Sequence, residues 1–352
     1  MPMSVLVSPT TPLDLRSDTV TRPSTAMRQV MAFAEVGDDV LDGDPTTVAL
    51  EAWTAAALGK ERALFFPSGS MANQAALWVH TTPGTEVLCD AEAHVYHWEI
   101  AGAAALCGVQ CRPVRSEGGV FRAADLRAHI RTPSKHAPEP SLVCLENTHN
   151  GAGGVVTSVE DMQEIQALAR EHALPVHLDG ARLWNAATAL QRPLAQLAAC
   201  ADSVMVSFSK GLGAPVGACL VGTERFIHQA HRARKRFGGG MRQSGILAAA
   251  ALYAGQHHYD RLAEDHASAR YLAQVVNGAG GARVVAPDTN IVMIDLPQPR
   301  AAAVVARAHE LGVRVTEWHP ARIRAVTHLD APAGAVAEAA ALLRQTFEEV
   351  LA

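Results

Sequence analysis

Short apolar runs alternate with longer stretches rich in alanine and leucine across residues 63–221. The runs have the length of strands, and the intervening stretches repeat their apolar residues at helical spacing. Because strands that alternate with helices form a sheet covered by helices on both faces, the sequence predicts an α/β domain. Its strands are expected at 63–66, 86–89, 142–145, 175–178, 203–208 and 218–221.

The same pattern predicts the helices and the domain boundaries. Helices are expected at 71–80, 158–171, 225–236 and, after the break at 238–240, from about residue 244. Past residue 257 the pattern changes to a helix at 260–277, a strand at 291–296 and further short pieces, which predicts a smaller α+β domain. The expected divisions are a tail at 1–13, a large domain at 14–255 and a small C-terminal domain at 256–352.

Charge and composition exclude several classes of partner. The 352-residue chain has a formal net charge of −5 and no long basic run, so neither nucleic acid nor an anionic membrane is expected to bind it. No apolar stretch reaches the roughly 18 residues that span a membrane, and the N-terminus does not resemble a secretory signal. The six cysteines show no CxxC pair, which predicts free buried thiols in a cytoplasmic protein. Histidine pairs such as His257-His258 lack ligand-spaced companions, so no metal centre is predicted.

Lys210 stands in Ser207-Phe208-Ser209-Lys210-Gly211-Leu212-Gly213, directly after a predicted strand. Lysines are rare in this chain, and arginine supplies nearly all the other positive charge. A lysine amine can lose its proton and form a Schiff base with a carbonyl, whereas a guanidinium stays protonated. Taken alone, this heptapeptide would more often be an ordinary loop with an exposed lysine.

Asp179 lies in Val176-His177-Leu178-Asp179-Gly180-Ala181-Arg182, at the C-terminal end of another predicted strand. Ligands bind at that edge in open α/β sheets. A lysine that holds an aldehyde and an aspartate that holds a protonated ring nitrogen are two groups that pyridoxal phosphate requires. Asp179 could also be a plain helix cap before Ala181.

Two further segments fit the same cofactor. Phe66-Pro67-Ser68-Gly69-Ser70-Met71-Ala72-Asn73 joins a predicted strand to a helix, where free backbone amides can bind a phosphate dianion. His94 follows the predicted strand at 86–89, and its imidazole could stack on a pyridine ring or transfer a proton. An empty turn and a surface histidine are the alternatives for these two segments.

With these residues in place, the chain resembles the L-threonine aldolase family of fold-type-I pyridoxal phosphate enzymes. The resemblance is carried by segments in the family's order from residue 14 to about 328. They are Asp14-Leu15-Arg16-Ser17-Asp18-Thr19-Val20-Thr21-Arg22-Pro23, Val36-Gly37-Asp38-Asp39, Leu145-Glu146-Asn147-Thr148-His149-Asn150, His177-Leu178-Asp179-Gly180-Ala181-Arg182, Ser209-Lys210-Gly211-Leu212, Gly238-Gly239-Gly240-Met241-Arg242-Gln243 and Arg324-Ala325-Val326-Thr327-His328.

The resemblance implies a fold, an assembly and roles for cofactor-binding residues. The fold would be a large domain with a mostly parallel seven-stranded sheet and a small C-terminal α+β domain. The assembly would be a homotetramer, a dimer of dimers with shared active sites. Lys210 would form the Schiff base, Asp179 would pair with the ring nitrogen, and His94 would stack on the ring. The other cofactor-binding residues, with Arg242 supplied by the neighbouring subunit, would be Gly69, Ser70, Met71, Arg182, Ser207 and Arg242.

The substrate-binding residues are also implied by the resemblance. Ser17, Arg182 and Arg324 would hold the substrate carboxylate, which suits the bidentate geometry of arginine, and His136 would contact the substrate hydroxyl. The sequence departs from the family at Leu41-Asp42-Gly43, where a tyrosine and a glycine are usual, and at Trp98, where a tyrosine or phenylalanine is common. These departures concern substrate preference.

The reaction implied is the cleavage of L-threonine, L-allo-threonine or another β-hydroxy-α-amino acid, such as phenylserine, to glycine and an aldehyde. The base that takes the hydroxyl proton would be His94, His136 or a water between them. The rival interpretations are a β-eliminating lyase, transaminase or racemase with the same cofactor, a nucleotide-binding dehydrogenase, and a non-catalytic binding protein. The dehydrogenase is disfavoured because Gly211-Leu212-Gly213-Ala214-Pro215-Val216-Gly217 has the wrong spacing for a dinucleotide loop.

Overall fold

The computed structural model describes residues 12–132 and 134–351, and these form two compact units. The larger unit spans residues 21–263, and the smaller unit combines residues 12–20 with residues 264–351. This division differs from the predicted domains at residues 14–20 and 256–263, and most of the predicted tail lies outside the described residues. Residues 14–20 group with the C-terminal unit because β1 (Leu13–Asp14) pairs in parallel with β11 (Val313–Arg314).

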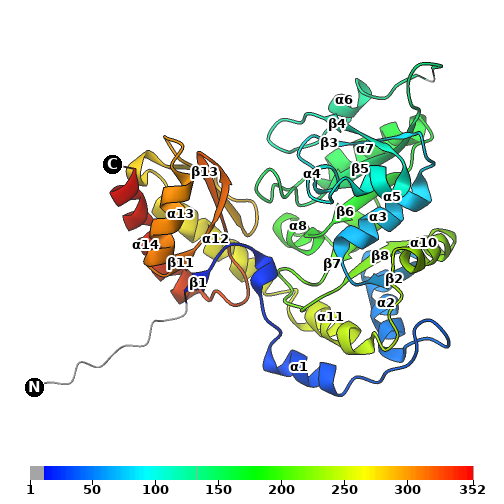
Figure 1. Cartoon of the computed structure of the whole chain (residues 1–352), viewed down its shortest axis with the longest axis horizontal. Coiled ribbons are helices and arrows are strands. Elements are labelled where there is room, and N and C mark those ends of the chain that lie inside the picture. The colour runs from blue at the N-terminus through cyan, green and yellow to red at the C-terminus, as the bar shows by residue number, and fades with distance from the viewer. Residues whose placement is uncertain (1–11, 133, 352) are drawn as a thin grey trace, which may run out of the picture. The chain divides into compact units, whose positions relative to one another are not determined.

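The larger unit is built on a seven-stranded sheet with the order β2-β8-β7-β6-β5-β3-β4, and the strand labels follow this order in Figure 1. Every neighbouring pair is parallel except the two pairs that β8 makes with β2 and β7. The prediction of a mostly parallel seven-stranded sheet is therefore confirmed. The strands are β2 (Arg62–Phe66), β3 (Glu86–Asp90), β4 (Gln110–Val114), β5 (Pro140–Glu146), β6 (Val176–Gly180), β7 (Ser203–Ser207) and β8 (Ala218–Gly222).

Side chains of the strands point alternately into two helical layers. In β7, Val204 and Val206 pack into one apolar cluster and Met205 into another, as the two-residue repeat of a strand requires. One layer consists of α3 (Gly69–His80), α4 (His94–His97), α5 (Gly102–Cys107) and α10 (Glu224–Arg236). The other consists of α1 (Thr25–Ala32), α2 (Pro45–Leu58), α6 (Ala123–Arg127), α7 (Val159–Glu171), α8 (Leu183–Leu190), α9 (Leu194–Ala198) and α11 (Gly245–His257).

The smaller unit has its own apolar core and a four-stranded sheet with the order β12-β13-β10-β9. Its neighbouring strands are all antiparallel, so the predicted α+β character is confirmed. Its elements beyond β1 and β11 are η1 (Asp18–Val20), α12 (Leu262–Val276), η2 (Ala279–Gly281), β9 (Arg283–Val284), β10 (Ile291–Asp295), α13 (Ala301–Glu310), β12 (Thr316–His319), β13 (Arg322–Val326) and α14 (Ala333–Val350).

Two expectations about the chain's surroundings can be compared with the structure. All six cysteines are free, and five of them are buried while Cys111 is half-buried. Among the described residues, every helix is too short or too polar to cross a membrane. The prediction of free thiols is therefore confirmed.

The turn that carries Lys210 joins β7 to β8. The amide of Phe208 donates to the carbonyl of Gly217 at 3.0 Å and closes the two strand ends, while the amide of Gly213 donates to the carbonyl of Lys210 at 2.8 Å. His258 Nδ1 donates to the carbonyl of Leu212 at 2.7 Å. The backbone around Lys210 is therefore held at several points by hydrogen bonds, which leaves the motion of the amine to rotations within the long lysine side chain.

We predict that Gly217→Ala destabilises the larger unit. Gly217 has a φ of +121°, and an added Cβ would lie 2.7 Å from Cε2 of the buried Phe65. Strain and overpacking together should lower the free energy of unfolding by about 2–3 kcal/mol, measured by urea denaturation. Gly334→Ala is the matched control, because a Cβ there meets nothing within 4 Å. Equal stability of the Gly217→Ala variant and the wild type would contradict the prediction.

Candidate active site

Four neighbouring parallel strands carry polar residues at the same edge of the sheet. Asp90 ends β3, Glu146 ends β5, Asp179 lies one residue before the end of β6, and Ser207 ends β7. Glu146 and Asp179 are direct neighbours in the pairing of β5 with β6. The carboxyl edge of a parallel sheet is where ligands bind, so this edge is the candidate active site.

Asp179 is held by hydrogen bonds to both of its carboxylate oxygens. Asn73 Nδ2 donates to Oδ2 at 2.8 Å, and the amide of Ala181 donates to Oδ1 at 3.0 Å. Asn73 Nδ2 also donates to Oε1 of Glu99 at 2.9 Å. The Asp179 and Glu99 side chains are nearly inaccessible to solvent, so a single amide bridges two buried carboxylates.

His94 lies beside this pair at the start of α4. Its amide donates to Oε2 of Glu146 at 2.7 Å, and its Nδ1 contacts Oε1 of Glu99 at 3.0 Å. Burial lowers the pKa of His94, but the hydrogen bond to Glu99 and the charges of Asp179 and Glu99 outweigh burial and raise the pKa above the ordinary 6.5. Gln74 Nε2 donates to the second oxygen of Glu99 at 2.6 Å. The imidazole is thus oriented through Nδ1, which leaves Nε2 for chemistry.

The two carboxylates make this part of the site suited to a cation. Ligand atoms of His94, Glu99 and Asp179 lie within 4.8 Å of one another. Buried negative charge is costly unless a positive group or hydrogen-bond donors face it. Asn73 supplies donors but no charge. A protonated ring nitrogen facing Asp179 fits this electrostatic requirement, because an opposite charge within a few ångströms stabilises both ions.

The first turn of α3 can hold a phosphate. Ser68 caps the helix by accepting from the amide of Met71 at 3.2 Å, and the amides of Gly69 and Ser70 have no acceptor within the helix because they stand in its first turn. A Cβ on Gly69 would lie 3.2 Å from the Met205 side chain. The absent side chain leaves the backbone open to a dianion, which the helix dipole also favours.

Ser207 ends β7, next to the strand that carries Asp179, and Lys210 follows in the turn that leads to β8. Lys210 is half-buried, and its carbonyl accepts from Thr21 Oγ1 at 3.4 Å. Ser207 is buried, with its Oγ 3.3 Å from the hydroxyl of Ser209. The predicted amine therefore follows the end of one strand, and the predicted ring-nitrogen partner lies near the end of the adjacent strand. Besides burial, the charge of Lys210 lowers the pKa of His94, against the larger combined effects that raise it.

Arg182 begins α8 immediately after β6 and is 5% exposed. Its Nη1 donates to Oδ1 of Asn150 at 3.1 Å, and the amide of Asn150 donates to Oε1 of Glu146 at 2.8 Å. The guanidinium is therefore placed through a residue of the neighbouring strand's loop. A fixed guanidinium of this kind suits bidentate binding of a carboxylate.

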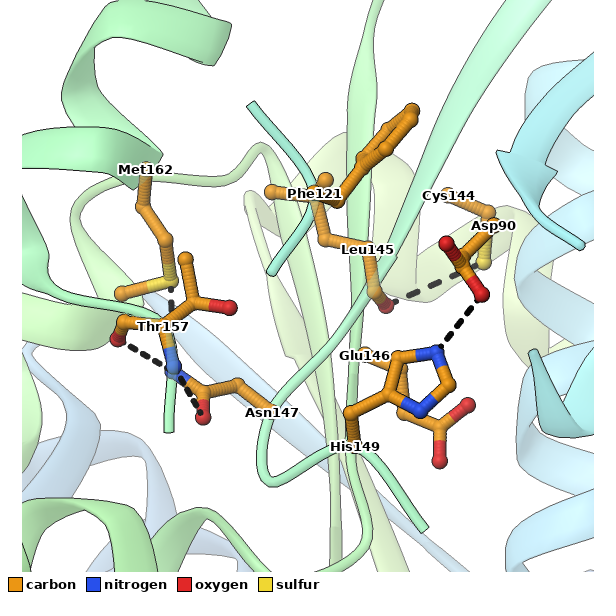
Figure 2. A pocket seen from close by; sticks show the side chains of 9 residues that line it. All are labelled: Asp90, Phe121, Cys144, Leu145, Glu146, Asn147, His149, Thr157 and Met162. Carbon is orange, nitrogen blue, oxygen red and sulfur yellow. Dashed lines mark hydrogen bonds and ion pairs between the residues drawn. The ribbon is translucent and has the colours of Figure 1, made fainter. Parts of the chain in front are cut away.

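A small pocket lies under the same loop (Figure 2). Figure 2 shows His149 pointing at Asp90, with Nε2 and Oδ1 2.9 Å apart. Burial raises the pKa of Asp90, but the hydrogen bonds from His149 and Ser116 outweigh it and lower the pKa below the usual value. This buried pair ties the loop after β5 to the end of β3. The pocket is lined by Asp90, Phe121, Cys144, Leu145, Glu146, Asn147, His149, Thr157 and Met162.

Two predicted residues lie apart from this cluster in the described chain. His136 is exposed, and its amide donates to the hydroxyl of Ser134. Arg242 is also exposed and pairs with Asp38 of its own chain, with Nη1 3.0 Å from Oδ2. The contact of His136 with substrate and that of Arg242 with a neighbouring subunit's phosphate stay predictions.

Ser17 and Arg324 belong to the smaller unit. Arg324 is 8% exposed, its Nη2 donates to the carbonyl of Arg16 at 3.2 Å, and its guanidinium lies 4.7 Å from the ring centre of Trp318. The structure therefore brings Arg324 beside the backbone that precedes Ser17. Their contact with a substrate carboxylate stays a prediction.

The two departures from the family pattern have different settings. Trp98 is 53% exposed and ends α4, where its amide donates to the carbonyl of His94 at 2.9 Å. Leu41 is 73% exposed, in the loop that follows Asp38. Trp98 therefore lies one helical turn from His94. The amide of Leu41 donates to the carbonyl of Asp38 at 3.1 Å, and the Asp38 carboxylate pairs with Arg242.

Sequence reasoning missed several residues of the site. No role was assigned to Glu99 or Asn73 from the sequence. In the structure, Asn73 donates to both Asp179 and Glu99, and Glu99 contacts His94. The signal available was polar residues within an otherwise apolar stretch, since Asn73 and Gln74 interrupt Ala-rich α3. His149 and Asn150 were noted only as part of a family segment.

The chain was compared with known proteins. The family model described as beta-eliminating lyase matches residues 14–299. The low-specificity L-threonine aldolase 1 of Arabidopsis thaliana is 44% identical over 90% of this chain and 91% of its own length. The low specificity L-threonine aldolase of Escherichia coli K12 is 42% identical over 94% and 97%.

A solved structure establishes the fold. The threonine aldolase of Leishmania major covers 96% of this chain and 100% of its own, with a TM-score of 0.81 at 20% identity. The predicted fold class is confirmed by this match. By the family model and by the identity to relatives over nearly the whole chain, the protein belongs to the beta-eliminating lyase family, in the group of the L-threonine aldolases.

Proposed function

We propose that this protein is a pyridoxal-phosphate-dependent aldolase that cleaves L-threonine, L-allo-threonine and other β-hydroxy-α-amino acids to glycine and an aldehyde. The observation that carries the proposal is the buried Asp179 at the carboxyl edge of β6, held by two hydrogen bonds and adjacent to the strand that ends before Lys210. The names of the relatives that align over nearly the whole chain support it.

The residues of the larger unit fit the cofactor at each of its ends. When bound, pyridoxal phosphate supplies an electron sink for the charge left on Cα when the Cα–Cβ bond breaks. Lys210 would bind its aldehyde, Asp179 would hold the proton on its ring nitrogen, and the amides of Gly69 and Ser70 would bind its phosphate. Ser207 is the last residue of β7 and precedes the turn that carries Lys210.

His94 is the base that the geometry favours. Its Nδ1–H donates to Glu99, so the neutral imidazole carries its lone pair on Nε2, and the carboxylate makes that nitrogen more basic. Nε2 would take the proton from the substrate's β-hydroxyl. His136 is exposed and has no contact with this cluster in the described chain.

Arg182 would bind the substrate carboxylate. Its Nη1 is oriented by Asn150, and the low exposure of the guanidinium strengthens its attraction for an anion. Fixing the carboxylate decides which bond at Cα is aligned for cleavage, and so distinguishes an aldolase from a transaminase or racemase.

The proposal includes a homotetramer that works in the cytoplasm. Large apolar side chains are exposed at the end of α1, in the following loop and at the starts of α2 and α11, as expected for a surface that a second copy covers. They are Phe33, Val36, Leu41, Val48 and Ile246. The free cysteines are compatible with a reducing compartment.

Product analysis tests the reaction. Purified protein with added pyridoxal phosphate is expected to convert L-threonine to equal amounts of glycine and acetaldehyde, measured by chromatography and by coupled reduction of the aldehyde. Comparing threonine with allo-threonine and phenylserine would then rank the substrates. Formation of pyruvate, another keto acid or D-threonine, without acetaldehyde, would show one of the rival activities instead.

Lys210→Ala should abolish covalent capture of the cofactor. Without the amine, borohydride treatment should leave no cofactor attached to the protein by mass spectrometry, and turnover should fall by on the order of 10³-fold or more. The control is Lys235→Ala, because Lys235 is exposed on α10. Full activity of the Lys210→Ala variant would refute the assignment.

The pKa of His94 should fall when Glu99 loses its charge. In the cofactor-free protein we expect the pKa of His94 above 6.5 and, in Glu99→Gln, a lower value, because burial is then opposed only by Asp179. NMR titration of the imidazole resonances measures both. Protonated His94 stabilises the folded state below pH 6.5, and this contribution is lost as the pH rises through the raised pKa.

The matched control for this titration is Ser116→Ala. Ser116 contacts Asp90 rather than His94, so its removal should leave the His94 titration in place. An unchanged His94 pKa in Glu99→Gln would show that the contact with Glu99 does not set the basicity of this imidazole.

A further inference from the structure

The hydrogen bonds behind Asp179 continue through the protein interior. Oδ1 of Asn73 lies 3.1 Å from Nε2 of His177, and Nδ1 of His177 lies 2.9 Å from Oγ of Ser203. The same hydroxyl lies 2.8 Å from Nε2 of His80. Asn73 is 1% exposed, and His177 and Ser203 are fully buried. The proposed chemistry gives no role to the side chains of His80, His177 and Ser203.

The fold places this chain of groups by simple repeats. Asn73 and His80 are seven residues apart on α3 and therefore share one face of the helix. His177 and Asp179 are two residues apart on β6 and share one face of the strand. Ser203 is the partner of His177 in the pairing of β6 with β7. Helix and sheet are thus connected at two successive levels.

The Asp179 carboxylate, at the end of this series of hydrogen bonds, determines which group donates at each step. Asn73 faces two carboxylates with one side of its amide, and that side must be Nδ2 because carboxylates only accept. Its Oδ1 therefore accepts from His177 Nε2–H. His177 Nδ1 must then accept from the Ser203 hydroxyl, which in turn accepts from His80 Nε2–H. Every donor points toward Asp179.

The two histidines carry no charge at neutral pH. Burial lowers the pKa of His177 to about 3 and that of His80 to about 4. A neutral relay therefore adds no positive charge on the side of Asn73 that faces His177. Both pKa values lie below the unfolded value of about 6.5, so this arrangement loses stability as the pH falls through that value.

We propose that His80, Ser203 and His177 are positioning residues that hold the Asn73 amide in the single orientation that donates to Asp179, and so set the carboxylate for the ring nitrogen of pyridoxal phosphate. This inference rests on the proposed function. If Ser203 no longer donates to Nδ1 of His177, the ring can carry its proton on Nδ1 instead of Nε2. The Nε2 lone pair would then face Oδ1 of Asn73 and push the amide away from its donation to Asp179.

The test measures cofactor affinity rather than turnover. Apoenzyme is titrated with pyridoxal phosphate and with an analogue in which C–H replaces the ring nitrogen, and binding is followed by absorbance. Ser203→Ala should weaken binding of pyridoxal phosphate by about three- to tenfold, the cost of a buried hydrogen bond, and should leave binding of the analogue unchanged. Ser203→Thr keeps the hydroxyl and should restore the wild-type affinity.

A second variant protects the test against misfolding. His80→Leu removes the outermost donor at a half-buried position and should show the same selective loss in a smaller amount. The control His172→Gln changes an exposed histidine that ends α7 and should match the wild type for both ligands. Thermal melting of each apoenzyme checks that the fold is intact.

The outcomes separate the relay from the cofactor assignment. Wild-type affinity for pyridoxal phosphate in Ser203→Ala, or an equal loss for both ligands, would overturn the positioning role and leave the proposed function standing. A folded wild-type protein that binds neither ligand would overturn the proposed function, and the inference with it. A loss confined to the nitrogen-containing ligand supports both.

Discussion

The site depends on one amide placed between two carboxylates. Asn73 donates to Asp179 and to Glu99, two acidic groups that water scarcely reaches. Such a pair is costly to bury without positive charge, and an amide dipole meets only part of that cost. His94 Nδ1 contacts the carboxylate of Glu99. We propose that the other carboxylate, Asp179, meets the protonated ring nitrogen of the cofactor.

Much of this arrangement could be predicted because the ends of strands can be recognised in a sequence. The apolar runs at β6 and β7 predicted parallel strands, and the polar residues that follow them predicted the ligand-binding edge. Asp179 and the turn with Lys210 therefore came from local patterns. The seven-stranded count did not, since β4 has a polar, half-exposed sequence with Pro113, as edge strands often do, and was not recognised.

What escaped prediction depends on contacts between distant segments. Glu99 and Asn73 meet because α3 and the turn between α4 and α5 pack on one face of the sheet. No spacing in the sequence indicates that contact. Likewise β1 pairs with β11, about three hundred residues away, so residues assigned to the large domain belong to the smaller unit. In the sequence, His177 is simply a residue of a predicted strand. Only the fold shows that its ring contacts Asn73 and Ser203.

The reversal of β8 has a consequence for how the lysine can work. The parallel neighbours in the sheet are joined by crossovers, but β7 is joined to its antiparallel neighbour β8 by the turn at residues 208–217. The backbone of Lys210 is therefore held by hydrogen bonds, while the four methylene groups of its side chain allow the amine to move. If Lys210 binds the cofactor as proposed, a flexible side chain on a fixed backbone would let the amine leave its partner and later return to the same position.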